Sequence, residues 1–72
     1  PEPYIVAMNI LGVRPSNTLI IEDSRVGIVS AIESGANVIA IQSPLVKEEI
    51  KSIDPNILSF DGYRSISNYL YK

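Results

Sequence analysis

Apolar and polar positions follow a helical period over the first part of the chain. Residues 3–11 carry four apolar side chains at the i, i+3, i+4, i+7 spacing that places them on one face of a helix. Pro3 suits the first turn of a helix, and Gly12 suits the position that ends one. We therefore predict a helix over residues 3–11 with a buried face and a turn at residues 15–17. The residues that share this face are Tyr4, Ala7, Met8 and Leu11.

Two nearly continuous apolar runs, residues 18–22 and residues 37–41, predict strands. Continuous apolar runs suit parallel strands that are covered on both faces. Between them, residues 25–34 are predicted to form a helix that Asp23 or Ser24 caps. The residues expected to face the core are Val26, Ile28, Val29 and Ile32, and those expected to face water are Ser30, Glu33 and Ser34.

Two further helices and a short strand are predicted in the second half of the chain. Ser43 is expected to cap a helix that begins at Pro44, and residues 57–60 are expected to form the strand. A last helix over residues 63–71 follows, with Asp61 as its expected cap and with Tyr63, Ile66 and Leu70 along one face. The element order α-β-α-β-α-β-α is typical of parallel strands joined by helical crossovers. The predicted fold is therefore α/β, a partial Rossmann-like parallel sheet with flanking helices.

A sheet of three parallel strands is small, because such sheets normally bury both faces beneath helices. We therefore expect residues 1–72 to belong to a larger doubly wound domain. An upstream segment or another chain is expected to cover the sheet edge beside residues 18–22.

Composition narrows the possible chemistry. The 72 residues allow one small domain, and they include no Cys and no His. Disulfides, thiolate metal sites and a histidine base are thereby excluded, and the lack of Cys fits the reducing cytoplasm. The net charge is −2 and the six basic residues are scattered, which argues against a nucleic-acid partner. No apolar run approaches the roughly 20 residues that span a membrane.

The candidate chemistry lies where residues 18–22 end in two neighbouring carboxylates, Glu22 and Asp23. Adjacent carboxylates repel each other unless a positive charge offsets them, and Mg²⁺ prefers oxygen ligands of this kind. Ser24 and a helix that contains Gly27 follow at once. The simpler interpretation is a pair of acids that the dipole at a helix N-terminus stabilises.

Four spaced motifs agree in order with one known family. They are Pro1-Glu2-Pro3-Tyr4, Leu11-Gly12-Val13-Arg14-Pro15, Ile21-Glu22-Asp23-Ser24-Arg25-Val26-Gly27 and Ala31-Ile32-Glu33-Ser34-Gly35-Ala36. This set resembles the haloacid dehalogenase (HAD) superfamily, and within it the β-phosphoglucomutase-like phosphatases and mutases. The resemblance covers about residues 1–42, while residues 43–72 match in pattern only, as the tail of that fold.

The resemblance implies a Mg²⁺ site and a phosphoryl-transfer activity. In that family the acids after the fourth core strand hold Mg²⁺, which helps to position and neutralise the transferred phosphoryl group. Asp23 would be the first choice for a direct or water-mediated ligand and Glu22 the second. Ser24 would orient the acidic loop and cap the helix, and Gly27 would allow close packing of the backbone. The substrate would be a small phosphorylated metabolite.

The chain also departs from the family pattern. The family's nucleophile is an Asp in a DxDxT-type loop far upstream, and neither that loop nor the Ser or Thr of the second motif occurs here. The Lys that precedes the family's Pro-x-Pro element is likewise missing before Pro1. Residues 1–72 are therefore expected to be the C-terminal fragment of a HAD-like catalytic core, without cap or nucleophile segment. Alone they would hold no catalytic residue and would be inactive.

Two alternatives remain open from the sequence. Receiver domains of two-component signalling also carry an acid pair after a strand, and Asp61 would then be the phosphate-accepting residue of a later strand. The other alternative is a scaffold that has kept the fold without the chemistry and serves as an interaction piece.

Overall fold

The computed structural model describes residues 1–42 and 45–71, and in that part of the chain helices alternate with strands as predicted. A short 3₁₀ helix, η1, replaces the expected turn before the first strand. The α/β class and the predicted order of elements are therefore confirmed. In chain order the elements are α1 (Glu2–Leu11), η1 (Pro15–Asn17), β1 (Leu19–Glu22), α2 (Arg25–Glu33), β2 (Asn37–Ile41), α3 (Lys47–Ile53), β3 (Leu58–Phe60) and α4 (Tyr63–Leu70).

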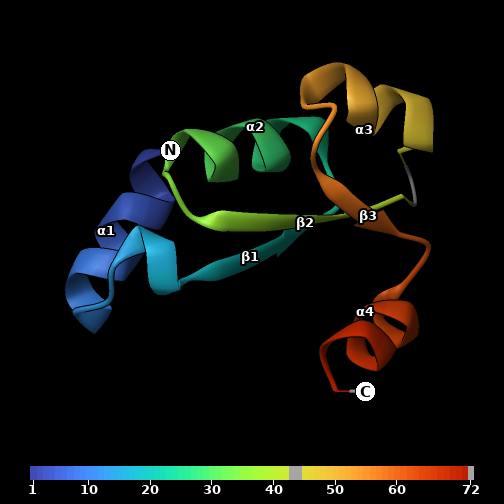
Figure 1. Ribbon diagram of the computed structural model, residues 1–72. Coiled ribbons are helices and arrows are strands. Elements are labelled where there is room, and N and C mark those ends of the chain that lie inside the picture. The colour runs from blue at the N-terminus through green and yellow to red at the C-terminus, as the bar shows by residue number, and fades with distance from the viewer. Residues whose placement is uncertain (43–44, 72) are drawn as a thin grey trace.

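The three strands form one parallel sheet in the order β1-β2-β3 (Figure 1). Leu19 lies opposite Asn37, and Ile39 lies opposite Leu58, so β3 begins two residues later along β2 than β1 does. The strand β2 is central, and β1 and β3 are the two edges of the described sheet. Because the strands are parallel, their C-terminal ends lie at the same end of the sheet, and the segments that follow them leave it there.

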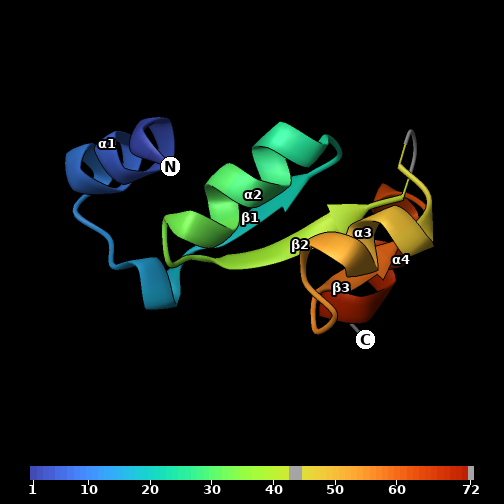
Figure 2. The same cartoon turned by 90° about the horizontal axis from the view of Figure 1, so that it is seen from above.

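Helices cover both faces of the sheet, α2 and α3 on one side and α4 on the other (Figure 1). Seen from above, α1 lies at one end of the molecule and α3 and α4 lie toward the other (Figure 2). Successive residues of β2 face opposite sides, so Ala40 joins the core under α2 and α3 while Ile39 and Ile41 join the core over α4. The buried residues of the first core are Ile28, Ala40 and Ile50, and those of the second are Ile39, Ile41 and Ile66.

Local turn chemistry sets several element boundaries. Gly12 ends α1 with φ 71°, and Gly35 follows α2 with φ 85°, both in the left-handed region that favours glycine. The helix α3 begins at Lys47 with Val46 as its N-cap, three residues later than predicted. The expected cap Ser43 and the expected first residue Pro44 lie outside the described residues.

The core-facing sides of the helices were only partly predicted correctly. On α2, Ile28 is fully buried, but Val26 is 80% exposed and Val29 is exposed as well, whereas Ser34, expected to face water, is buried. The Ser34 hydroxyl donates a hydrogen bond to the Ala31 carbonyl, which satisfies its polar group inside the molecule. Both valines lie in an open surface hollow that Pro1 also lines, so the described chain covers them only in part.

The first and last helices show the same limits. On α1, Met8 is buried as predicted, but Leu11 is 73% exposed. On α4, Ile66 is buried, while Tyr63 is exposed. Asp61 is not the cap of α4: that position belongs to Gly62.

Candidate metal-binding acidic loop

The acidic loop joins β1 to α2 at the end of the sheet that holds the C-terminal ends of the strands. Glu22 is the last residue of β1, Asp23 lies in the link, and Ser24 is the N-cap of α2. The Ser24 Oγ accepts a hydrogen bond from the Gly27 amide at 3.0 Å, so the predicted capping role of Ser24 is confirmed and Asp23 is not the cap. Both acids therefore stand at a strand end and outside any helix.

The carboxylate of Glu22 is half-buried and held by two donors. The Tyr4 hydroxyl, reaching from α1, donates to Oε2, and the Asp23 amide donates to Oε1 at 3.3 Å. The hydrogen bond to Glu22 and, to a lesser extent, desolvation and the negative charge of that carboxylate raise the pKa of Tyr4 to about 12. The carboxylate is therefore held in one place, between α1 and the start of α2.

Gly27 makes room for that carboxylate. A Cβ atom at this position would lie 2.6 Å from Glu22 Oε1, closer than Cβ atoms come to other heavy atoms. The sequence predicts close packing of backbone at Gly27. The close neighbour in the structure is instead the side chain of Glu22. Gly27 and Tyr4 confine Glu22 from two elements that are separate in the sequence.

Sequence reasoning placed Tyr4 on the core face of the first helix and missed its contact with Glu22. The two residues are 18 positions apart, and the contact depends on how α1 lies against α2. A signal was nevertheless present: a tyrosine is the only residue with a polar tip on that otherwise apolar face, and buried tyrosine hydroxyls usually find a partner.

Asp23, in contrast to Glu22, is exposed. The loop therefore offers one exposed and one half-buried carboxylate, and this all-oxygen donor set suits a hard cation such as Mg²⁺. Mg²⁺ takes six ligands in octahedral geometry, which two carboxylates cannot complete. Within residues 1–42 and 45–71, no three acidic, His or Cys residues are grouped so that they could hold a metal ion. The loop thus fits part of a Mg²⁺ site whose other ligands would be water, phosphate or groups from elsewhere.

Asp61, the residue of the receiver-like alternative, lies away from the acid pair. It follows β3, and β2 separates β3 from β1, so two strand spacings of roughly 5 Å each lie between the strand ends. The Asp61 carboxylate accepts a hydrogen bond from the Ser65 hydroxyl at 2.7 Å. This arrangement does not favour a phosphate-accepting aspartate that shares a cation with Glu22 and Asp23.

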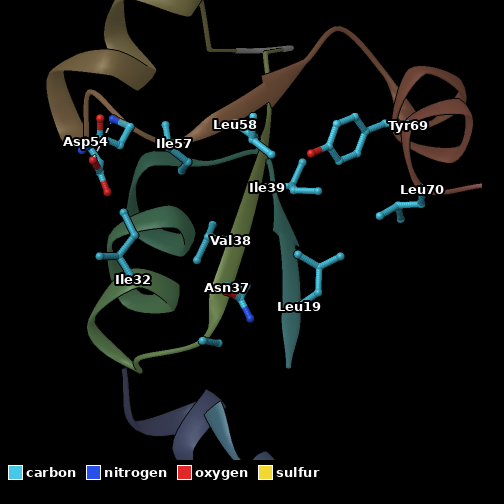
Figure 3. Close-up of a pocket in the computed structure, with 12 residues that line it drawn as sticks. Leu19, Ile32, Asn37, Val38, Ile39, Asp54, Ile57, Leu58, Tyr69 and Leu70 are labelled. Atoms are coloured by element: carbon cyan, nitrogen blue, oxygen red, sulfur yellow. Dashed lines mark hydrogen bonds between the residues drawn. The ribbon is translucent and has the colours of Figure 1, made fainter. Parts of the chain in front are cut away.

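An open hollow of about 460 Å³ lies at the opposite end of the sheet, where the N-terminal ends of the strands lie (Figure 3). The first residues of all three strands, Leu19, Asn37 and Leu58, line it. Tyr69 and Leu70 of α4 reach it from one side of β2 and Ile32 of α2 from the other (Figure 3). Since the acidic loop follows the C-terminal end of β1, this hollow is separate from the candidate metal site.

Comparison with known proteins shows a similarity to a phosphatase sequence. Over 54 residues, or 75% of this chain, the sequence is 28% identical to hexitol phosphatase A of Escherichia coli. The match spans 25% of the length of that relative. No family model matches the chain, and no solved structure matches it.

Proposed function

We propose that residues 1–72 form the C-terminal part of a HAD-like catalytic core in a Mg²⁺-dependent phosphatase or phosphomutase. The β-phosphoglucomutase-like branch is part of this proposal, as is a small phosphorylated metabolite as substrate. The observation that carries it is the acid pair at the end of a parallel strand, directly before a serine-capped helix. The similarity to a phosphatase supports the reaction class.

In this proposal the chain supplies the metal-binding loop and not the nucleophile. Asp23 is exposed at the C-terminal end of β1, where it can reach a cation, and Glu22 contributes the second carboxylate. A bound Mg²⁺ would supply positive charge for the phosphoryl group and for the attacking and leaving oxygens. Ser24 caps α2, and this cap holds the loop at the start of the helix.

Further parts of the proposal concern the surroundings of the chain. A strand from an upstream segment or another chain would pair with the open edge of β1. No helix of residues 1–42 and 45–71 has the length and apolar character needed to cross a bilayer. The cytoplasm is the proposed location, because a chain without Cys suits a reducing compartment.

The test is a titration of the 72-residue chain with Mg²⁺, monitored through its amide NMR signals. Shifts that saturate and centre on Glu22, Asp23 and Ser24 are expected, and Asp23→Asn should abolish them. Asp54→Asn, which alters an acid in the turn after α3, is the matched control and should bind as the original chain does. No shift at the loop, or equal shifts in Asp23→Asn, would favour the scaffold alternative.

The phosphatase activity itself is tested with the polypeptide that carries a DxDxT segment ahead of these residues. It should hydrolyse a generic phosphate monoester in the presence of Mg²⁺, and Asp23→Asn should lower the turnover by at least roughly 100-fold. The 72-residue chain alone should show no turnover, and turnover by it would contradict the assigned division of roles.

A further inference from the structure

We infer that Tyr4 is a positioning residue of the acidic loop: its hydroxyl holds the Glu22 carboxylate over Gly27 in the orientation that the cation site needs. This inference rests on the proposed function, because it assigns a task to Tyr4 at the same site. Tyr4 itself touches neither a cation nor a substrate in this assignment.

The first argument is the geometry around Glu22. Its carboxylate accepts from the Tyr4 hydroxyl at one oxygen and from the Asp23 amide at the other. Each carboxylate oxygen can accept more than one partner, so both oxygens keep capacity for a cation. The two donors fix the rotation of the carboxylate and couple it to the backbone of Asp23.

The second argument is the space at Gly27. A methyl group there would stand 2.6 Å from Glu22 Oε1 and would displace the carboxylate that Tyr4 holds. Gly27 lies in the first turn of α2, although glycine is a poorer helix former than alanine. A hydrogen-bond donor on α1 and a missing side chain on α2 thus act on the same carboxylate from two sides.

The third argument is that a fixed carboxylate binds a cation with less reorganisation than a mobile one. Groups that hydrogen-bond to metal ligands orient them, and removing such a group typically weakens metal binding by roughly 10- to 100-fold. Tyr4 is partly buried and anchored by a helix whose Met8 is buried, so its hydroxyl is itself held in position.

The experiment compares cation affinity in the 72-residue chain and its variants. Dissociation constants for Mg²⁺ are measured by NMR titration and those for Mn²⁺ by the electron paramagnetic resonance of the free ion. Tyr4→Phe keeps the ring and removes the hydroxyl, and it should raise both dissociation constants roughly tenfold. Tyr63→Phe alters an exposed tyrosine on α4 and should leave both constants unchanged.

Gly27→Ala provides an independent variant that moves the same carboxylate. It should weaken binding to a similar degree, and the double variant Tyr4→Phe/Gly27→Ala should be little weaker than either single one, because both remove the same arrangement. The carboxyl carbon of Glu22, observed by ¹³C NMR, should shift in both single variants. Circular dichroism at the titration temperature establishes that each variant is folded.

The outcomes separate this inference from the proposed function. If the original chain binds Mg²⁺ at the loop and Tyr4→Phe binds equally well or more tightly, the positioning role is wrong and the metal site stands. If the original chain binds no cation at the loop, both are overturned. Weaker binding by Tyr4→Phe with an unchanged Tyr63→Phe control supports the inference.

Discussion

At the scale of single residues, the acidic loop is defined by a few short contacts. Ser24 caps α2, Gly27 leaves space for Glu22, and Tyr4 reaches Glu22 from another helix. Each of these contacts can be removed or blocked by a single substitution.

Ser24→Ala should lower the free energy of unfolding by about 1 kcal/mol, because the Gly27 amide loses its acceptor. Urea denaturation followed by circular dichroism measures this change. Ser24→Asp retains a capping oxygen and is the matched control, with an expected loss well under half of that value. Equal losses in both variants would mean that the cap contributes little.

The pH dependence of stability should report the contact between Tyr4 and Glu22. The pKa of Tyr4 is raised from 10.0 to about 12 in the folded chain, so the stabilisation is fully present below about pH 10 and is lost as the pH rises through about 12. At about pH 9 the original chain should be more stable than Tyr4→Phe by roughly 1 kcal/mol. Urea denaturation of both at rising pH should show this difference shrinking toward zero by about pH 12. A difference that stays constant would contradict the assigned hydrogen bond.

At the scale of elements, α2 shows how the number of neighbouring strands decides which helix face is buried. Its sequence has apolar residues around more than one face, and only the face toward the sheet, with Ile28 and Ala31, is covered. Val26 and Val29 follow the helical pattern equally well but meet no strand of the described chain.

A matched pair of substitutions on α2 tests this difference. Ile28→Ala should destabilise the chain by about 3 kcal/mol, because it opens a cavity in a fully buried position. Val26→Ala, at a position 80% exposed, should change stability by no more than about 0.5 kcal/mol. Thermal or urea unfolding gives both values. A large effect of Val26→Ala in the 72-residue chain would mean that a partner already covers this face.

At the scale of the whole molecule, the sheet is narrow and its edge at β1 is open. An edge strand exposes unpaired backbone groups that can pair with another chain. Apolar side chains are exposed on this strand and on the helix that follows it, among them Leu19 on β1 and Val26 on α2. The proposed covering strand would satisfy the backbone groups and bury these side chains.

In the absence of that strand, the folded 72-residue chain should associate with itself through the edge at β1. Sedimentation velocity at about 10 to 100 µM is the measurement, and Leu19→Lys, which places a charge on the edge strand, should reduce association. Leu11→Lys, at an exposed leucine on α1, is the control and should leave association as it is. An original chain that stays monomeric up to about 100 µM would contradict the proposed covering strand.

Local sequence patterns were enough to predict the elements and their order. Strand and helix periods, the glycines that end α1 and α2, and the Ser24 cap each depend on residues a few positions apart. The place of Glu22 and Asp23 at a strand end follows from the same kind of pattern. For this reason the acid pair stands out in the amino-acid sequence without any knowledge of its distant neighbours.

Long-range packing, in contrast, settles which apolar faces are covered and what Glu22 contacts. Tyr4 meets Glu22 across 18 positions, and Val26 stays exposed while Ile28 is buried on the same helix. Such outcomes depend on which strand neighbours which and on how one helix leans on another. Local periodicity cannot specify these arrangements, because it fixes the direction of a side chain within its element and not what lies opposite it.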